Sequence, residues 1–427
     1  METLGSKRQF AYLLCSVLLS LALVACGGTG NSTNSSSSNV GSSSGATNPG
    51  SGSSGGTSQD AGGSGVTRSS NGSVYLYSSI YTDGGGVTAF AQNGTGTLTQ
   101  VSGSPYIQQA AASMGALAAF NGYVYISNLG PLTSTHPELV YYRVDPATGA
   151  LTQVDTVDAG VGTNGDSQMR SLLINPADNV MYGIFQYTVA TYSLSSSGAP
   201  TFVSSTAPSS DSVWGFDFMQ HGPYAYAAIQ NGNPSSGFQV PEIHLLTIAA
   251  DGSLHDSRTV ATLSNASGMA GDLKVDPSGK FVVVSTGERN EQLSVYAIQS
   301  DGSLVEVPGS PFSTGAEQLR YMAFDSTGNF LYTVNQHEEE PQTESVQVFS
   351  MNQSTGALTS VQTLNQLNEQ NVTWLKVDGN FVYLTNVVGG THSVITTYTR
   401  AAKTGQLTQT SVTTVDKALG QTETLHE

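Results

Sequence analysis

Short apolar segments recur through the chain at intervals of roughly 50 residues, a period typical of strand-built repeats. The segments at 330–335 and 381–386 are mostly apolar and end in Asn. A short run that is apolar on both faces is typical of a strand buried between neighbouring sheets. The pattern therefore predicts a radial array of small sheets. Its segments begin at Ser73, Tyr123, Val180, Tyr224, Phe281, Phe330 and Phe381.

Each repeat contains four expected strands, as residues 319–363 illustrate. A strand at 319–324 leads through a tight turn into the apolar strand at 330–335, and an alternating strand follows at 345–350. A turn that contains Gly356 then begins the fourth strand. No segment shows a convincing helical period. Four antiparallel strands repeated seven times predict an all-β, seven-bladed β-propeller of four-stranded blades.

The two ends of the array predict how the ring closes. The first copy begins at a second strand, 73–77, and the last copy is followed by a short stretch at 421–427. We expect this tail to be the innermost strand of the blade whose other strands come from the N-terminal end. Such closure removes the free sheet edges of an open array.

The first 25 residues have the pattern of an export signal. A basic pair precedes an uncharged apolar stretch at 10–24, which is short for a membrane span. Residues 23–27, Leu-Val-Ala-Cys-Gly, resemble the lipobox of bacterial lipoproteins. The resemblance implies that a signal peptide at 1–25 is cleaved and that Cys26 is acylated. It also implies a lipid anchor in the bacterial cell envelope.

The segment that follows, 26–68, consists largely of Gly, Ser, Thr and Asn. Such a composition cannot bury enough apolar surface to offset the entropy of ordering, so we expect a flexible tether. Residues 69–427 are expected to form the propeller. Gly27 stands where enterobacterial lipoproteins retained at the inner membrane carry Asp, so the resemblance favours the outer membrane.

Charge and cysteine content narrow the expected partners. The chain has 14 basic and 31 acidic residues, a net charge of −17, which argues against nucleic acid as a partner. Cys15 lies within the predicted signal, so the mature chain keeps no pair of cysteines for a disulfide. We expect a monomer that contacts the membrane through Cys26 and binds a small ligand or an envelope protein.

One face of the predicted ring carries the long, variable loops. The turns between first and second strands, and between third and fourth strands, are short and similar. Variable loops on a rigid scaffold usually carry function. When the repeats are aligned, polar and aromatic residues gather at the loop-side ends of the inner strands: Arg170, Gln186, Trp214, Gln230, Asp272, Arg320, Tyr321, Gln336 and Trp374.

These side chains suit a polar ligand that is anionic or sugar-like. Arg binds carboxylate or phosphate groups, and indole rings cover apolar ring faces. The alternative is that they hold buried waters and close the channel. We expect no cofactor and no metal. Residues 337–340, His-Glu-Glu-Glu, could offer ligands to a cation, but nothing holds them in a fixed geometry, so we interpret them as a solvated loop tip.

The repeat resembles the seven-bladed propellers of the lactonase family, which includes bacterial 6-phosphogluconolactonase and fungal cis,cis-muconate lactonizing enzymes. The resemblance spans residues 73–427. It rests on strands such as Tyr-Val-Tyr-Ile-Ser-Asn at 123–128 and turns such as Asp-Pro-Ala-Thr-Gly-Ala-Leu at 145–151. In that family a Pro-Arg-His run and an Asn-Glu strand tip bind the acidic substrate and supply acid and base chemistry.

Only part of that family motif is present. Arg320 is retained, but Tyr321 stands at the His position and Gln336 at the Glu position, and a Gln cannot act as a general base. These changes favour a non-catalytic binding propeller. The alternative is a divergent lactone hydrolase for an extracytoplasmic lactone, in which Arg170 and Arg320 hold the carboxylate and Asp272 is the base.

Overall fold

In the computed structural model the chain divides into two compact units, Met1–Val66 and Thr67–Glu427. The predicted signal peptide and Cys26 lie outside the described residues. No helix among the described residues is long and apolar enough to cross a membrane. The structure describes residues 73–80, 85–107, 115–128, 137–161, 169–230, 232–233, 237–238, 240–263, 270–286, 292–315, 318–337, 343–367 and 371–427.

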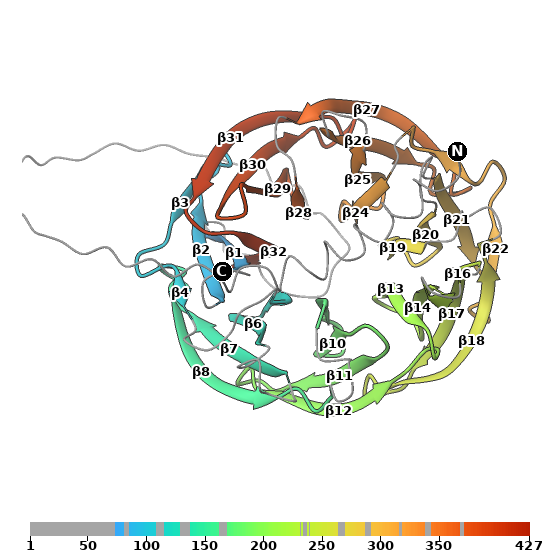
Figure 1. The fold of residues 1–427 in the computed structure, drawn as a ribbon, viewed down its shortest axis with the longest axis horizontal. Helices are drawn as coiled ribbons and strands as arrows, with labels where there is room; N and C mark the ends of the chain where they lie inside the picture. The colour runs from blue at the N-terminus through green and yellow to red at the C-terminus, as the bar shows by residue number, and fades with distance from the viewer. Residues whose placement is uncertain are drawn as a thin grey trace, which may run out of the picture. The chain divides into compact units, whose positions relative to one another are not determined.

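The second unit is a seven-bladed β-propeller, as predicted (Figure 1). Each blade is an antiparallel sheet of four main strands, and we number the blades in chain order. Blade 1 contains, from the innermost strand outwards, β32 (Leu419–His426), β1 (Val74–Ile80), β2 (Gly86–Gln92) and β3 (Leu98–Gln100), with β4 (Tyr106–Ile107) also beside β2. Blade 2 contains β5 (Leu117–Phe120), β6 (Tyr123–Asn128), β7 (Glu138–Val144) and β8 (Leu151–Asp158).

The next three blades repeat this order. Blade 3 contains β9 (Ser171–Asn175), β10 (Val180–Ile184), β11 (Val189–Leu194) and β12 (Pro200–Thr206). Blade 4 contains β13 (Ser212–Phe218), β14 (Tyr224–Gln230), β17 (Glu242–Ile248) and β18 (Leu254–Thr262), and β15 (Gly232–Asn233) pairs separately with β16 (Gly237–Phe238). Blade 5 contains β19 (Ala270–Val275), β20 (Phe281–Thr286), β21 (Gln292–Ile298) and β22 (Leu304–Glu306), with β23 (Phe312–Ser313) also beside β21.

The last two blades have four strands each. Blade 6 contains β24 (Gln318–Phe324), β25 (Phe330–His337), β26 (Thr343–Met351) and β27 (Leu358–Leu367). Blade 7 contains β28 (Val372–Asp378), β29 (Phe381–Val388), β30 (His392–Arg400) and β31 (Leu407–Val415).

The C-terminal strand closes the ring in the predicted way. β32 pairs antiparallel with β1, with Val74 opposite His426 and Ile80 opposite Leu419, so the strand begins slightly earlier than the sequence suggested. The hydroxyl group of Thr422 lies 2.7 Å from that of Ser78. Blade 1 is therefore assembled from both ends of the propeller.

The core lies between the blades. Every residue of the second strands β10 and β20 is buried, whereas the outermost strand β8 buries fully only its first residue. One core cluster joins Tyr182 and Ile184 of blade 3 to Phe216 and Ala227 of blade 4. Since each blade buries its faces against its two neighbours, the apolar driving force acts around the whole ring.

A buried tyrosine links most neighbouring blades. Its ring lies in the second strand of one blade, and its hydroxyl donates to a glycine carbonyl in the outer turn of the next blade at 2.9–3.0 Å. Burial raises the pKa of each of these hydroxyls well above the ordinary value, so they remain donors. The pairs are Tyr77–Gly149, Tyr125–Gly198, Tyr182–Gly252, Tyr226–Gly302 and Tyr332–Gly405.

The turn itself requires glycine at the accepting position. Gly252 has a φ of +81°, and a Cβ atom added there would lie 2.5 Å from the side chain of Val180 in the preceding blade. Only glycine meets both conditions without strain. The recurring Gly in the sequence is thus explained by backbone conformation and by close packing against the neighbouring blade.

An ion pair joins blades 6 and 7 on the face of the ring that carries the short turns. The guanidinium of Arg400 donates to the carboxylate of Asp325 at 3.0 Å, and the two side chains are 7% and 1% exposed. Arg400 also donates to the carbonyl oxygen of Gly379 at 3.0 Å. A buried pair depends on such additional hydrogen bonds to offset the loss of hydration.

We predict that Tyr182→Phe lowers the free energy of unfolding by about 1–2 kcal/mol, because the buried carbonyl of Gly252 loses its donor. Tyr106→Phe is the matched control: it removes the same atom from a solvent-exposed 3.5 Å contact and should change stability by less than about 0.5 kcal/mol. Urea unfolding followed by circular dichroism measures both. Equal effects would refute the role of the buried hydroxyl.

Candidate functional site

The innermost strands of blades 4 to 7 are interrupted by β-bulges near their loop-side ends. Trp214, Arg320 and Thr373 are each skipped in the pairing with the second strand, and β19 is interrupted between Ala270 and Leu273. Bulges redirect side chains and occur frequently beside active sites. Trp214, Arg320 and Thr373 therefore share a bulged backbone, whereas Arg170 precedes β9, which pairs with β10 without a register shift. Successive inner strands contact one another around the centre of the ring (Figure 1).

Blades 3 and 4 bring together two of the predicted residues. The guanidinium carbon of Arg170 lies 5.5 Å from the ring centroid of Trp214, a cation–π distance. The same guanidinium donates to the carbonyl oxygen of Val213 at 3.0 Å, which fixes its plane. Trp214 is still 41% exposed. The pair thus presents an ordered, positively charged and aromatic surface.

A third predicted residue lies at the same junction. The amide of Gln186 donates to the hydroxyl of Tyr187 at 2.8 Å and lies 3.3 Å from the hydroxyl of Ser212. Tyr187 is 37% exposed and was not predicted. It directly follows the strand-tip Gln in the chain, and that position is the signal that could have indicated it.

Blades 6 and 7 carry a second aromatic pair. The rings of Tyr321 and Trp374 are 5.4 Å apart between centroids and inclined at 56°. Arg320, which precedes Tyr321, is exposed and occupies the bulge of β24. Both junctions therefore combine an arginine with aromatic rings, as the alignment of the repeats suggested.

Asp272 is heavily engaged. One carboxylate oxygen of Asp272 accepts from Lys274 Nζ at 2.9 Å and from the backbone amide of Leu273. The other oxygen accepts from the backbone amide of Met322 at 2.9 Å. Since Met322 belongs to the innermost strand of the next blade, Asp272 connects blades 5 and 6. A carboxylate with both oxygens occupied in this way is poorly placed to take a proton from water.

Asp217 forms the equivalent link one blade earlier. Its carboxylate accepts from the amide of Val275 at 2.9 Å. Burial raises the pKa of Asp217 to about 6, although nearby Lys274 and the amide donors act in the opposite direction. Burial favours the neutral amine of Lys274, yet the carboxylates of Asp272 and Asp217 hold its pKa above the ordinary value. This cluster was not identified from the sequence.

The same kind of link continues around the ring. Thr373 donates to the carbonyl oxygen of Leu419 at 2.9 Å, and the amide of Val372 donates to the buried carboxylate of Glu344 at 2.9–3.0 Å. Thr373 thus satisfies a backbone group of the next inner strand, whereas Glu344 reaches the inner strand of blade 7 from β26, the third strand of blade 6.

Gln421 extends these links across blade 1, and the sequence did not single it out. Its amide oxygen accepts from the amide of Leu117 at 3.0 Å, and its amide nitrogen donates to the carbonyl oxygen of Leu172 at 3.3 Å. One side chain from β32 therefore reaches both blade 2 and blade 3. The final strand fixes the inner ring as well as the outline of blade 1.

The remaining predicted residues are less informative. Gln230 is 1% exposed, so its side chain belongs to the interior. The backbone of Gln336 in β25 pairs with that of Gln318 in β24. The structure does not describe the side chain of Gln336 or the acidic run 338–340. Within the described part, no three His, Cys, Asp or Glu residues gather as a metal site would require.

The comparisons with known proteins support the fold and the resemblance. The model of the lactonase family, described as a seven-bladed beta-propeller, matches residues 217–374. A putative 6-phosphogluconolactonase from Bacteroides uniformis is 17% identical, and the match covers 83% of this chain and 99% of that one with a TM-score of 0.62. For the periplasmic gluconolactonase of Pseudomonas aeruginosa the identity is 17%, the coverage 82% and 99%, and the TM-score 0.63. No curated protein matches the chain.

The pKa of Asp217 predicts a pH dependence of stability. Because its folded pKa of about 6 exceeds the ordinary 3.8, the folded state binds more protons between these values, and this contribution to stability is lost as pH rises through them. The difference in unfolding free energy between wild type and Asp217→Asn should therefore fall by about 2.4 kcal/mol from pH 4 to pH 7. Exposed Asp155→Asn is the control. Urea titrations across this range measure the difference, and parallel curves for all three proteins would contradict the assignment.

Proposed function

From this likeness to the lactonase propellers we propose that the protein binds a small polar or anionic ligand at the loop-side ends of its innermost strands, without catalysing its hydrolysis. The observation that carries the proposal is the pairing of Arg170 with Trp214, in which a fixed cation lies against an exposed ring. Arginine supplies directed donors to a carboxylate or phosphate. The ring offers an apolar face to the rest of the ligand.

The second junction supports the same chemistry. Arg320 directly precedes Tyr321 in the chain, and the ring of Tyr321 contacts that of Trp374. Two arginine–aromatic groups on one face of a ring suit a ligand with an anionic group and a ring or polyol body. Gluconate and 6-phosphogluconate are suitable probes because the solved structures of similar fold include proteins described as gluconolactonase and 6-phosphogluconolactonase.

The residues at the positions for acid–base chemistry favour binding without catalysis. Asp272, the base of the alternative mechanism, has both carboxylate oxygens occupied by Lys274 and backbone amides. Tyr321 and Gln336 stand where the resemblance to lactonases would place His and Glu. Without a free base, water attack on a lactone carbonyl loses the contribution of proton transfer, typically about 10²–10⁴-fold.

The second candidate is a divergent lactone hydrolase, and the match of residues 217–374 to the lactonase family model favours it. In that case Arg170 and Arg320 would hold the substrate and Asp272 would act as the base after release from Lys274. Hydrolysis of glucono-lactone and of small aliphatic lactones by the purified protein separates the two candidates. Turnover that is lost in Asp272→Asn would establish the enzyme; a rate equal to the uncatalysed rate would support binding alone.

We also propose that the protein is an envelope lipoprotein, anchored through Cys26 and favouring the outer membrane, and that it acts as a monomer. The support is the lipobox-like Leu-Val-Ala-Cys-Gly at 23–27 behind a basic and apolar leader. Two or more acyl chains give firm membrane attachment, whereas a single chain binds only reversibly. A tethered propeller would meet ligands outside the cytosol.

For ligand binding, we expect Arg170→Gln and Arg320→Gln each to weaken gluconate binding by roughly 10–100-fold, since each removes a charge-assisted hydrogen bond of about 1.5–3 kcal/mol. Isothermal titration calorimetry measures the change. The control is Arg143→Gln, an exposed arginine of β7 in blade 2. Binding that survives in both site variants, or that falls equally in the control, would refute the site.

For the anchor, we expect expression in a Gram-negative bacterium with radiolabelled palmitate to label the wild-type protein and Cys15→Ser but not Cys26→Ser. Cys15 is the matched control because it lies within the predicted signal peptide and would be removed on cleavage. Labelling is read by autoradiography of the purified protein. Label retained in Cys26→Ser would exclude the proposed lipidation.

A further inference from the structure

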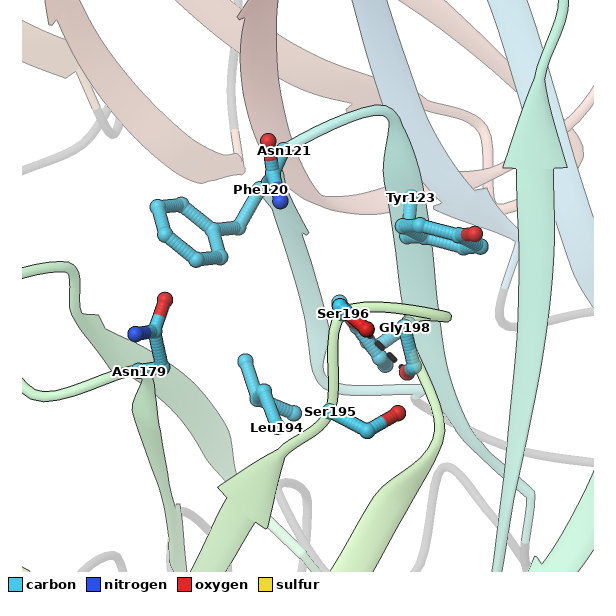
Figure 2. A pocket seen from close by; sticks show the side chains of 9 residues that line it. Phe120, Asn121, Tyr123, Asn179, Leu194, Ser195, Ser196 and Gly198 are labelled. Atoms are coloured by element: carbon cyan, nitrogen blue, oxygen red, sulfur yellow. Dashed lines mark hydrogen bonds between the residues drawn. The ribbon is translucent and has the colours of Figure 1, made fainter.

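A pocket of about 190 Å³ lies between blades 2 and 3, at the end of the inner strands opposite the bulges (Figure 2). Phe120, the last residue of β5, forms one wall, and Tyr123 at the start of β6 forms another. Asn179 and the turn that ends at Gly198, both in blade 3, complete it. None of these residues takes part in the proposed anion site.

The pocket lies beside the short inner turn of blade 2. Asn121 and Gly122 alone connect β5 to β6, and their φ values of 49° and 77° are typical of a two-residue type I′ hairpin. Blade 7 also has a two-residue turn, whereas the connection has four residues in blade 3 and five residues in blades 5 and 6. In blades 3, 5 and 6 the strand end carries a buried Asn or Asp that accepts turn amides, and in blade 2 that position is Phe120. The buried residues are Asn175, Asp276 and Asp325.

The lining combines aromatic surface with neutral hydrogen-bonding groups. Figure 2 shows the carboxamides of Asn121 and Asn179 on the same side of the pocket as the ring of Phe120, with Ser196 facing them across the opening. The residues that line the pocket include no charged side chain. Carboxamides both donate and accept hydrogen bonds, and hydroxyl groups do the same. Such a lining matches the hydroxyl groups and apolar C–H faces of a sugar.

The walls are held in place before any ligand arrives. Tyr125 donates to the carbonyl oxygen of Gly198 at 2.9 Å, and the amide of Leu194 donates to the carbonyl oxygen of Asn179 at 2.8 Å. The hydroxyl of Ser195 accepts from the amide of Ala199 at 3.0 Å. A preorganised site loses little entropy on binding.

We propose that this pocket binds one ring of a neutral saccharide. Its volume equals that of roughly six water molecules in the liquid, which admits a single six-membered ring but not a drug-sized ligand. The absence of a cation in the lining disfavours sugar acids. A propeller with both sites would hold an anionic ligand at one end of the inner strands and an uncharged sugar at the other.

The test is a titration of the full-length protein with methyl glucoside, followed by saturation-transfer NMR, with glucuronate as the charged counterpart. The double variant Asn179→Gly and Ser196→Ala should weaken methyl glucoside binding at least tenfold. Glycine preserves the left-handed backbone of Asn179, at φ 53°, while removing the carboxamide. Asn371→Gly is the matched control because Asn371 is an exposed Asn at φ 68° in another blade.

Two further binding measurements distinguish this site from the proposed anion site. Arg320→Gln should leave methyl glucoside binding unchanged, and the double variant should leave gluconate binding unchanged. Methyl glucoside that shows no saturable binding would overturn the proposal. Equal binding of wild type and a correctly folded double variant, or stronger binding of glucuronate than of methyl glucoside at this pocket, would also overturn it.

Discussion

A buried hydrogen bond between a tyrosine hydroxyl and a turn glycine of the next blade is the contact on which the rest of the propeller depends. Each blade alone is a small sheet with two apolar faces, and it becomes stable only when both faces are covered. The tyrosine fixes how far one sheet rotates against the next, because its hydroxyl must reach one carbonyl oxygen at 2.9–3.0 Å. In blade 5 the equivalent position is Val283, so that interface lacks the tyrosine hydrogen bond and relies on packing and on the bond from the Met322 amide to Asp272.

The inner ends of the blades have a different constraint, since seven strands converge there and their edge groups need partners. Asp217, Asp272, Thr373 and Gln421 satisfy backbone groups of neighbouring strands. Residues used in this way are unavailable for chemistry, whereas Trp214 and Arg320 at the bulges remain exposed. The same ring of positions therefore divides into residues that hold the ring and residues that can meet a ligand. This division is the basis of our proposal that the protein binds a ligand without hydrolysing it.

The two ends of the inner strands differ in chemistry because different structures terminate them. At the loop side, bulges direct cationic and aromatic side chains outwards. At the opposite side, a buried Asn or Asp accepts turn amides in blades 3, 5 and 6, whereas Phe120 stands at that position in blade 2, beside a neutral pocket. A local change of residue at one strand end thus accompanies a distinct surface on an otherwise repetitive scaffold.

The sequence by itself determined the strand repeat, the number of blades and the closing strand, because apolar periodicity and turn residues act locally and are legible along the chain. It also placed Arg170, Trp214 and Arg320 at one level, and Tyr321 and Trp374 at the next. Only the tertiary structure decided which partners the side chains at these positions contact. Asp272 became a link between blades because Met322 of the next strand lies beside it, and Gln421 meets Leu117 only because the C-terminal strand returns to blade 1. Such contacts join residues far apart in the chain, and no local pattern encodes them.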